Sequence, residues 1–213
     1  KSELAPEKIQ ALGRYDSPLI SNAIEAFKIR DHSEGYTSRE IRCQFRDLQP
    51  MVGYAVTCTM DSTTPGPKPY SKLAKLLEIL DAAPKPAIVV IQDVSPDPLR
   101  SCFSGDISCT VYQALGAVGL VQDGGFRDLS GIRHHAPGFQ VFAPGEVVSH
   151  GNAVVVDVDV PISVGGMDVE PGDLLHGDES GVVKVPIVIA DAVIEQVEKV
   201  REVEKKLFDR VNP

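Results

Sequence analysis

The chain has 213 residues, of which 43% are hydrophobic and 24% charged, the proportions of an ordinary globular protein. Acidic side chains outnumber basic ones by 30 to 21, which gives a formal net charge of -9. This charge disfavours nucleic-acid partners, which need clustered Lys and Arg, and no apolar stretch is long enough to span a membrane.

The four cysteines, at positions 43, 58, 102 and 109, form no C-x-x-C pair. We therefore expect reduced, mostly buried thiols in a cytoplasmic protein. No signal-peptide pattern opens the chain, although it begins at Lys1 without Met, which is consistent with a trimmed N-terminus.

Residues 1–30 are expected to be helical. Ser17 and Pro18 form a helix start, with Ser17 as the cap and Pro18 at the first helical position. The polar stretch Asp31 to Gln49 has no clean period and predicts a loop that contacts a partner or a ligand. Val52 to Thr59 is rich in β-forming residues and predicts a strand.

The middle of the chain predicts a βαβ unit. Leucines recur at i, i+3, i+4 and i+7 between residues 73 and 80, which indicates an amphipathic helix. The β-branched run Ala87 to Gln92 is typical of a parallel strand covered on both faces. After a loop from Asp93 to Ser104, a helix from Asp106 to Leu115 and a strand from Val118 to Gln122 complete a right-handed unit.

The second half predicts a short helix after Asp128 that reaches His135, then a strand from Phe139 to Ala143. Short strands follow: Val154 to Val160 alternates Val and Asp with period 2, and Gly181 to Val185 is another. We expect one α/β domain over the whole chain, 1–213. Its parts are N-terminal helices in residues 1–30, a core in residues 50–186 and a C-terminal helix in residues 187–208.

Two turns of the βαβ unit carry the candidate site, because the carboxyl ends of neighbouring parallel strands share one edge of a sheet. Gly105 and Asp106 open a helix, whose free amides and dipole can bind a carboxylate or phosphate. Alternatively, Asp106 only caps that helix. Arg127 offers a planar fork for a carboxylate, and Asp128 can hold a divalent cation directly or through water. Alternatively, these two form a surface ion pair worth ~0–1 kcal/mol.

The other polar groups give weaker indications of a functional site. The five histidines, at positions 32, 134, 135, 150 and 176, lack any zinc-ligand spacing and are expected to be surface or satisfied core residues. The acidic stretch Gly177 to Gly181 is a second-rank metal candidate and is more typical of a tight turn between strands.

Several motifs together resemble one family. They are G-D-I-S from Gly105, A-L-G-A-V-G-L-V-Q-D-G-G-F-R-D ending at Asp128, P-G-F-Q-V-F-A from Pro137, and P-G-D-L-L-H-G-D-E-S-G-V-V-K-V-P ending at Pro186. The chain is similar to the RraA-like family, which contains the regulator of ribonuclease activity A and divalent-metal-dependent 4-hydroxy-4-methyl-2-oxoglutarate aldolases. The resemblance implies a β/β/α swivelling-type fold with a central mixed sheet, assembled as homotrimers or hexamers with sites at subunit interfaces.

The resemblance also implies residue roles. Gly105, Asp106 and Ile107 match the loop whose amides bind the pyruvate carboxylate. Arg127 matches the arginine that contacts the keto acid. Asp128 matches the aspartate that anchors Mg²⁺ or Mn²⁺. The implied activity is class II aldol cleavage of a 4-hydroxy-2-keto acid through a pyruvate enolate, with oxaloacetate decarboxylation as the side activity.

One position departs from the family pattern. The aldolases carry an acid three residues after the Arg-Asp aspartate, where this chain has Gly131. A second acid, donated by the neighbouring subunit, would be Glu195, Glu198 or Glu202. Gly131 keeps alternatives open: a non-catalytic regulator that binds a ribonuclease or another protein, or a different metal-dependent lyase or hydrolase.

Overall fold

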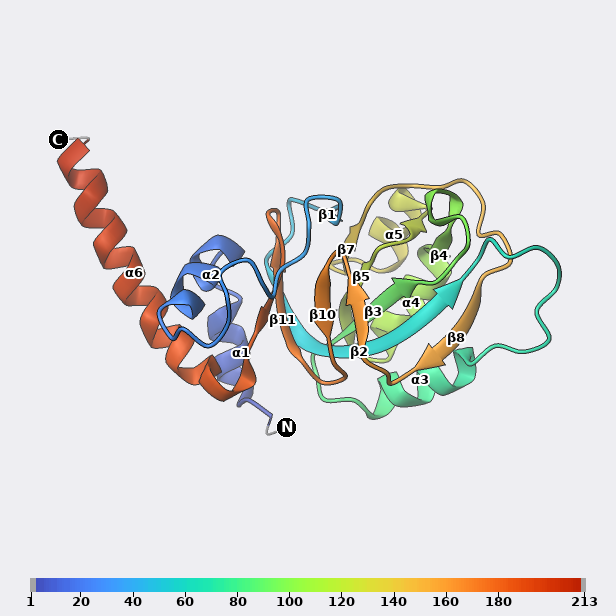
Figure 1. The fold of residues 1–213 in the computed structure, drawn as a ribbon, viewed down its shortest axis with the longest axis horizontal. Coiled ribbons are helices and arrows are strands. Elements are labelled where there is room, and N and C mark those ends of the chain that lie inside the picture. Colours follow the sequence, from blue (N-terminus) through green and yellow to red (C-terminus); the bar gives the residue numbers. More distant parts are fainter. Residues whose placement is uncertain (1–2, 212–213) are drawn as a thin grey trace.

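The computed structural model describes residues 3–211 and builds them around one mixed sheet with helices packed on it (Figure 1). This is the expected α/β fold; the terminal residues 1–2 and 212–213 of the predicted domain lie outside the described part. The strand order is β1-β7-β5-β3-β2-β11-β12, and β8 also pairs with β2. The strand bounds are β1 Arg42–Cys43, β2 Met51–Asp61, β3 Ala87–Asp93, β5 Ala117–Gln122, β7 Gln140–Ala143, β8 Val154–Val158, β11 Leu174–Asp178 and β12 Gly181–Val185.

The middle of the sheet is parallel and covered on both faces. Strands β2, β3, β5 and β7 run parallel, whereas the outer strands pair antiparallel. Residues 87–91 of β3 are fully buried, which confirms the prediction from their β-branched sequence. One face packs against α3, α4 and α5, and the other against the hairpin β9–β10. The covering elements are α3 Leu73–Ala82, α4 Asp106–Ala114, α5 Leu129–His135, β9 Ile162–Val164 and β10 Met167–Val169.

A third hydrophobic cluster lies at the other end of the molecule. Helices α1 (Pro6–Leu12), α2 (Ser17–Glu25) and α6 (Ala190–Val211) pack together and against β11 and β12. In Figure 1, α6 runs along α1 and α2, and its last turns extend beyond them. The predicted helix at 187–208 therefore begins later than expected, after a 3₁₀ turn at Ile187–Ile189, and continues to Val211.

The start of α2 differs from the prediction. Asp16, and not Ser17, is the cap, because its carboxylate accepts the Leu19 amide at 2.8 Å. Ser17 instead ties α2 to β11: its amide donates to Asp178 at 2.7 Å, and its hydroxyl lies 2.9 Å from His176 Nδ1. Residues 177–181 form the turn of the β11–β12 hairpin, as their sequence favours. His176 is fully buried and hydrogen-bonded, as expected of a satisfied core histidine.

Two predicted loops contain short strands. The stretch Asp93 to Ser104 holds a 3₁₀ turn and β4 (Cys102–Ser104), which pairs in parallel with β6 (Gly125–Phe126). The polar loop Asp31 to Gln49 likewise contains β1, which pairs with β7. Strands of two or three residues have no measurable period, so only their partners reveal them. The strand predicted at 154–160 ends early, at Val158, because the backbone turns at Asp159 with φ 57°.

All four cysteines are buried and free of disulfides, as predicted. No helix among residues 3–211 combines the length and the apolar character needed to cross a bilayer.

Asp123, which follows β5, makes stability depend on pH. Burial, with the nearby Asp93 carboxylate adding to it, raises the pKa of Asp123 to about 6. Between pH ~4 and ~6 the folded protein holds a proton on Asp123 that the unfolded chain has released. The free energy of unfolding therefore falls as pH rises through ~6, where the buried carboxyl group becomes charged. Asp123→Asn should therefore raise the free energy of unfolding more at about pH 8 than at about pH 5, measured by urea denaturation.

The Asn variant keeps an acceptor for the Asp93 amide, which lies 2.6 Å from Asp123 Oδ1. Asp168→Asn, at an exposed position, is the control and should show no such difference between the two pH values. If Asp123→Asn changed the free energy of unfolding equally at both pH values, the raised pKa of Asp123 would be contradicted.

Candidate active site

The short β4–β6 pairing brings the two predicted turns together. Ser104 lies opposite Phe126, and the Arg127 amide donates to the Ser104 carbonyl at 3.0 Å. Gly105, which follows Ser104, then lies against Arg127 and Asp128, which follow Phe126. The expected proximity of the two turns is confirmed, although β4 rather than β3 delivers the first of them.

Gly105 is the point of closest approach. A Cβ atom added there would lie 3.0 Å from Asp128 Oδ2 and 3.3 Å from Arg127 Cγ. Its backbone is extended, with φ -154°, so any residue could adopt its conformation. Glycine leaves room at this position, because a Cβ atom would push the Arg127 and Asp128 side chains away by a few tenths of an ångström.

The buried side-chain amide of Gln122 links the two turns by hydrogen bonds. Gln122, fully buried at the end of β5, accepts from the Ser104 hydroxyl at 2.8 Å. Its Nε2 donates to the carbonyls of Gly124 and Gly125 at 3.0 and 2.6 Å. Sequence reasoning took Gln122 only as the end of a strand. A polar residue that closes an apolar run was the available signal.

Arg127 and Asp128 form an ion pair, with Arg127 Nε 3.1 Å from Asp128 Oδ2, and both side chains are partly exposed. Asp128 has a left-handed backbone, with φ 64° and ψ 41°, where it starts α5. Such a conformation costs an aspartate about 1 kcal/mol or more and is often retained at functional sites. The fold thus fixes the backbone at Asp128, while the partial exposure of both side chains also fits the alternative of a surface ion pair.

The N-terminus of α4 supplies donors at the same corner. The Gly105 amide donates to the Ser108 hydroxyl, and the Ile107 amide to the Asp106 carboxylate. The amides of Asp106 and Ser108 have no acceptor among the described residues. Gly105 rather than Asp106 is the N-cap, so the capping alternative is wrong in its assignment of the cap residue. Of the three predicted cradle amides, only that of Asp106 is open, and Ser108 adds another.

All five predicted site residues line one cavity of about 280 Å³. Its polar lining includes the side chains of Asp106, Arg127, Asp128 and His150. The remaining wall is mostly apolar and comes from α3, β4 and α4. Its residues are Leu73, Leu77, Phe103, Ile107, Val111 and Tyr112.

The carboxylates present suit a hydrated divalent cation. Among the described residues, no cluster of three or more His, Cys, Asp or Glu could form a closed metal cage. Two carboxylates, Asp106 and Asp128, line the cavity, which matches the way Mg²⁺ binds through one or two carboxylates while it keeps several waters. The sequence search had assigned only Asp128 to the cation.

Asp106 also bears on the missing acid at position 131. Atoms of its carboxyl group lie 3.0 to 3.3 Å from the place where a Gly131 Cβ would be. The carboxylate of α4 thus occupies the space beside α5 that a side chain at 131 would enter. The other expected acids, Glu195, Glu198 and Glu202, belong to α6, at the far end of the molecule from α4 in Figure 1.

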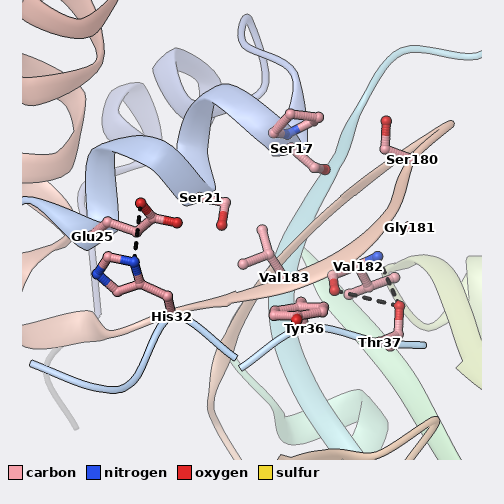
Figure 2. Close-up of a pocket in the computed structure, with 11 residues that line it drawn as sticks. Ser17, Ser21, Glu25, His32, Tyr36, Thr37, Ser180, Gly181, Val182 and Val183 are labelled. Atoms are coloured by element: carbon pink, nitrogen blue, oxygen red, sulfur yellow. Dashed lines mark hydrogen bonds and ion pairs between the residues drawn. The ribbon is translucent and has the colours of Figure 1, made fainter. Parts of the chain in front are cut away.

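A second cavity, of about 310 Å³, lies between α2 and β12 (Figure 2). Glu25 and His32 lie side by side in its lining, with His32 Nδ1 3.6 Å from a Glu25 carboxylate oxygen, and the Thr37 hydroxyl bonds the Val182 backbone. The Ser17 hydroxyl is engaged by His176. These polar groups satisfy one another, so the first cavity is the better candidate for chemistry.

Known proteins share this sequence pattern. A "Putative 4-hydroxy-4-methyl-2-oxoglutarate aldolase" of Halalkalibacterium halodurans is 32% identical over 128 residues, which are 60% of this chain and 59% of that relative. Protein DlpA of Legionella pneumophila is 25% identical over 97% of this chain and 32% of its own length. The chain thus spans about three fifths and one third of the length of these curated relatives.

The fold is shared with solved structures. The crystal structure of Streptomyces coelicolor RraAS2, described as an unusual member of the RNase ES inhibitor RraA protein family, superposes with a TM-score of 0.77. The match covers 99% of this chain and 98% of that one at 22% identity, which supports the fold alone. The RraA-like family model, described as Aldolase/RraA, matches residues 18–184. This match covers most of the chain, from the start of α2 to the end of β12, and the chain therefore belongs to the RraA-like family.

Proposed function

We propose that this protein is a divalent-metal-dependent carbon–carbon lyase that releases pyruvate from a 4-hydroxy-2-keto acid or from oxaloacetate. The observation that carries the proposal is the convergence of Arg127, Asp128 and the open amides of α4 on one cavity. An enolate-forming site needs an anion cradle, a positive charge and a cation anchor, and these groups supply all three. The named relative from H. halodurans points to the same class of reaction.

The geometry supports the following roles. The Arg127 guanidinium and the amides of Asp106 and Ser108 bind the substrate carboxylate and the oxygen on which negative charge develops. Asp128, with Asp106 beside it, anchors Mg²⁺ or Mn²⁺, mainly through water. A bound cation supplies a Lewis acid for the 2-keto oxygen. The ion pair between Arg127 and Asp128 fixes both groups relative to each other before substrate binds.

The protein is proposed to act as a homotrimer or hexamer with the site at a subunit interface. Near the end of α6, the apolar residues Val203, Leu207, Phe208 and Val211 are 55% to 72% exposed. At the other end, Ile107 on the cavity rim is 77% exposed. Two different apolar surfaces at opposite ends favour a head-to-tail contact, which closes into a ring. Such a contact would bring glutamates of α6 toward a neighbouring cavity.

A regulatory role is the second candidate. Arg39, Arg42 and Arg46 are exposed around a groove of about 640 Å³, and none has a carboxylate partner within 4 Å among residues 3–211. Unpaired arginines on an acidic protein fit an acidic protein segment better than RNA, given the net charge of -9. The free, buried thiols fit a reducing compartment such as the cytoplasm.

The first test is metal-dependent pyruvate release. Oxaloacetate and 4-hydroxy-4-methyl-2-oxoglutarate should each give pyruvate with Mg²⁺ or Mn²⁺, and release should fall to background in EDTA. Asp128→Asn should lower kcat/KM by about 100-fold or more, because an amide is a poor cation ligand. Asn also tolerates the left-handed backbone, so thermal stability should be unchanged.

The control for this test is Asp168→Asn, at an exposed position outside the cavity, which should be fully active. A normal rate in Asp128→Asn would place the cation elsewhere. No release from any substrate would exclude the lyase and favour the regulator.

The second test concerns space at Gly105. Gly105→Ala should lower kcat/KM by about 10-fold, because the added Cβ shifts the Arg127 and Asp128 side chains by a few tenths of an ångström and disturbs their alignment. The unfolding free energy should change by less than about 1 kcal/mol, since the backbone there is extended. Gly145→Ala is the matched control, because a Cβ there meets nothing within 4 Å. Equal activity of both variants would show that the close approach is not needed.

The third test concerns assembly. Phe208→Glu should convert the oligomer to monomers, as measured by light scattering, because it places a charge in the apolar stripe of α6. Lys206→Gln makes the same change in net charge about 200° around the helix and should leave the oligomer intact. A monomeric wild-type protein would contradict the proposed ring.

A further inference from the structure

His150 is the group in the candidate cavity whose chemistry the roles above do not use. It lies in the loop between β7 and β8, is exposed, and lines the same cavity as Asp106, Arg127 and Asp128. Its position in the sequence, far from the Arg-Asp pair and without a ligand spacing, gave no reason to connect it with them. Tertiary structure alone brings it to the site.

The hydrogen bond of the ring defines its free nitrogen. His150 Nδ1 lies 2.8 Å from the Gly151 carbonyl oxygen. A carbonyl oxygen only accepts, so Nδ1 carries the proton in this contact. The neutral ring then has its lone pair on Nε2, which makes no hydrogen bond to a described residue. His150, a lining residue of the cavity, thus has a ring nitrogen with an unused lone pair.

The loop that carries His150 is held from outside the cavity. The Asn152 amide donates to the Ser62 carbonyl at 2.8 Å, and its side chain to the Thr64 carbonyl at 3.2 Å. Gly151 has φ 54° and packs so closely on the Ser62 carbonyl that a Cβ would not fit. These contacts fix the backbone on the residue's C-terminal side, which limits where the ring can go.

The other ionisable groups of the cavity are committed or unsuitable. Asp128 is paired with Arg127, and Asp106 accepts the Ile107 amide. Burial raises the pKa of Tyr112, whose hydroxyl therefore stays protonated. Arginine has no lone pair to accept a proton. Among the described residues that line the cavity, His150 remains the side chain suited to move a proton.

We propose that His150 is the acid–base residue of the aldol cleavage, an inference that rests on the proposed lyase function. Nε2 takes the proton of the C4 hydroxyl group, and the C4–O bond becomes the carbonyl of the departing fragment. The C3–C4 bond breaks, and its electron pair forms the enolate of pyruvate. The imidazolium then returns the proton to C3, which yields pyruvate and restores the neutral ring. No oxidant or other co-reactant is required.

This role separates two reactions at one site. Cleavage of a 4-hydroxy-2-keto acid must remove the C4 hydroxyl proton, whereas oxaloacetate loses CO₂ and has no such proton. His150→Ala should therefore lower kcat for cleavage of 4-hydroxy-4-methyl-2-oxoglutarate by about 100-fold or more. Oxaloacetate decarboxylation should fall by less than about fivefold, because water can protonate the enolate. Added imidazole should restore part of the cleavage activity.

The measurements use the wild-type assembly, His150→Ala, His150→Gln and the exposed control His134→Ala, each with Mg²⁺. KM and calorimetric Mg²⁺ affinity should change by less than about threefold in the His150 variants, since the proton-transfer role is separate from binding. His134→Ala should match wild type. Imidazole should rescue His150→Ala more than His150→Gln, whose side chain fills the space.

Each outcome decides between the alternatives. Unchanged cleavage in His150→Ala would overturn the inference and leave the lyase function intact. Equal loss of both reactions, weakened Mg²⁺ binding or no rescue would make His150 a structural residue and would also overturn it. No pyruvate from wild type with either substrate would overturn the lyase function itself, and this inference with it.

Discussion

The site depends on the parallel contact between two very short strands, β4 and β6. They lie apart from the main sheet, and they carry the start of α4 and the Arg127-Asp128 pair to the same point. Gln122 fastens them, because its amide satisfies the Ser104 hydroxyl and two glycine carbonyls in a fully buried position. Buried polar networks of this kind are costly when one member is lost, so they specify a single arrangement. Gly105 then allows the strand ends to meet without a side chain between them.

The charged side chains of the candidate cavity determine the chemistry that it can support. One guanidinium and two carboxylates line a cavity whose remaining wall is largely apolar, and the Arg127–Asp128 ion pair within it is partly exposed to solvent. The two carboxylates reach the corner from different helices, Asp128 from the start of α5 and Asp106 from the start of α4. The space beside Gly131 is filled by Asp106, which suggests a physical reason for the missing acid: a second carboxylate there would compete with the first for room and charge.

The single chain exposes apolar side chains at both ends of the molecule. The last turns of α6 extend beyond α1 and α2 in Figure 1 and carry an apolar stripe that nothing in the described chain covers. The cavity rim, with Ile107, is also exposed. An isolated protomer would lose hydrophobic free energy at both surfaces, and one head-to-tail contact would bury both. The proposed assembly would therefore place the end of a neighbouring α6 against the cavity in which the chemistry is proposed.

Composition and pattern determined much of this protein. The doubly buried strand β3, the amphipathic α3 and the order of the βαβ unit follow from local periodicity, which neighbours in sequence suffice to encode. The Gly105 and Arg127-Asp128 turns could be named because strand ends of a parallel unit share an edge. Tertiary structure alone decided the rest. Strands as short as β1, β4 and β6 exist only through their partners, and His150 and Gln122 join the site or its support through contacts between segments distant in sequence. Such contacts leave no local period, so the pattern of neighbouring residues predicts neither the partners of these short strands nor the place of His150 in the cavity.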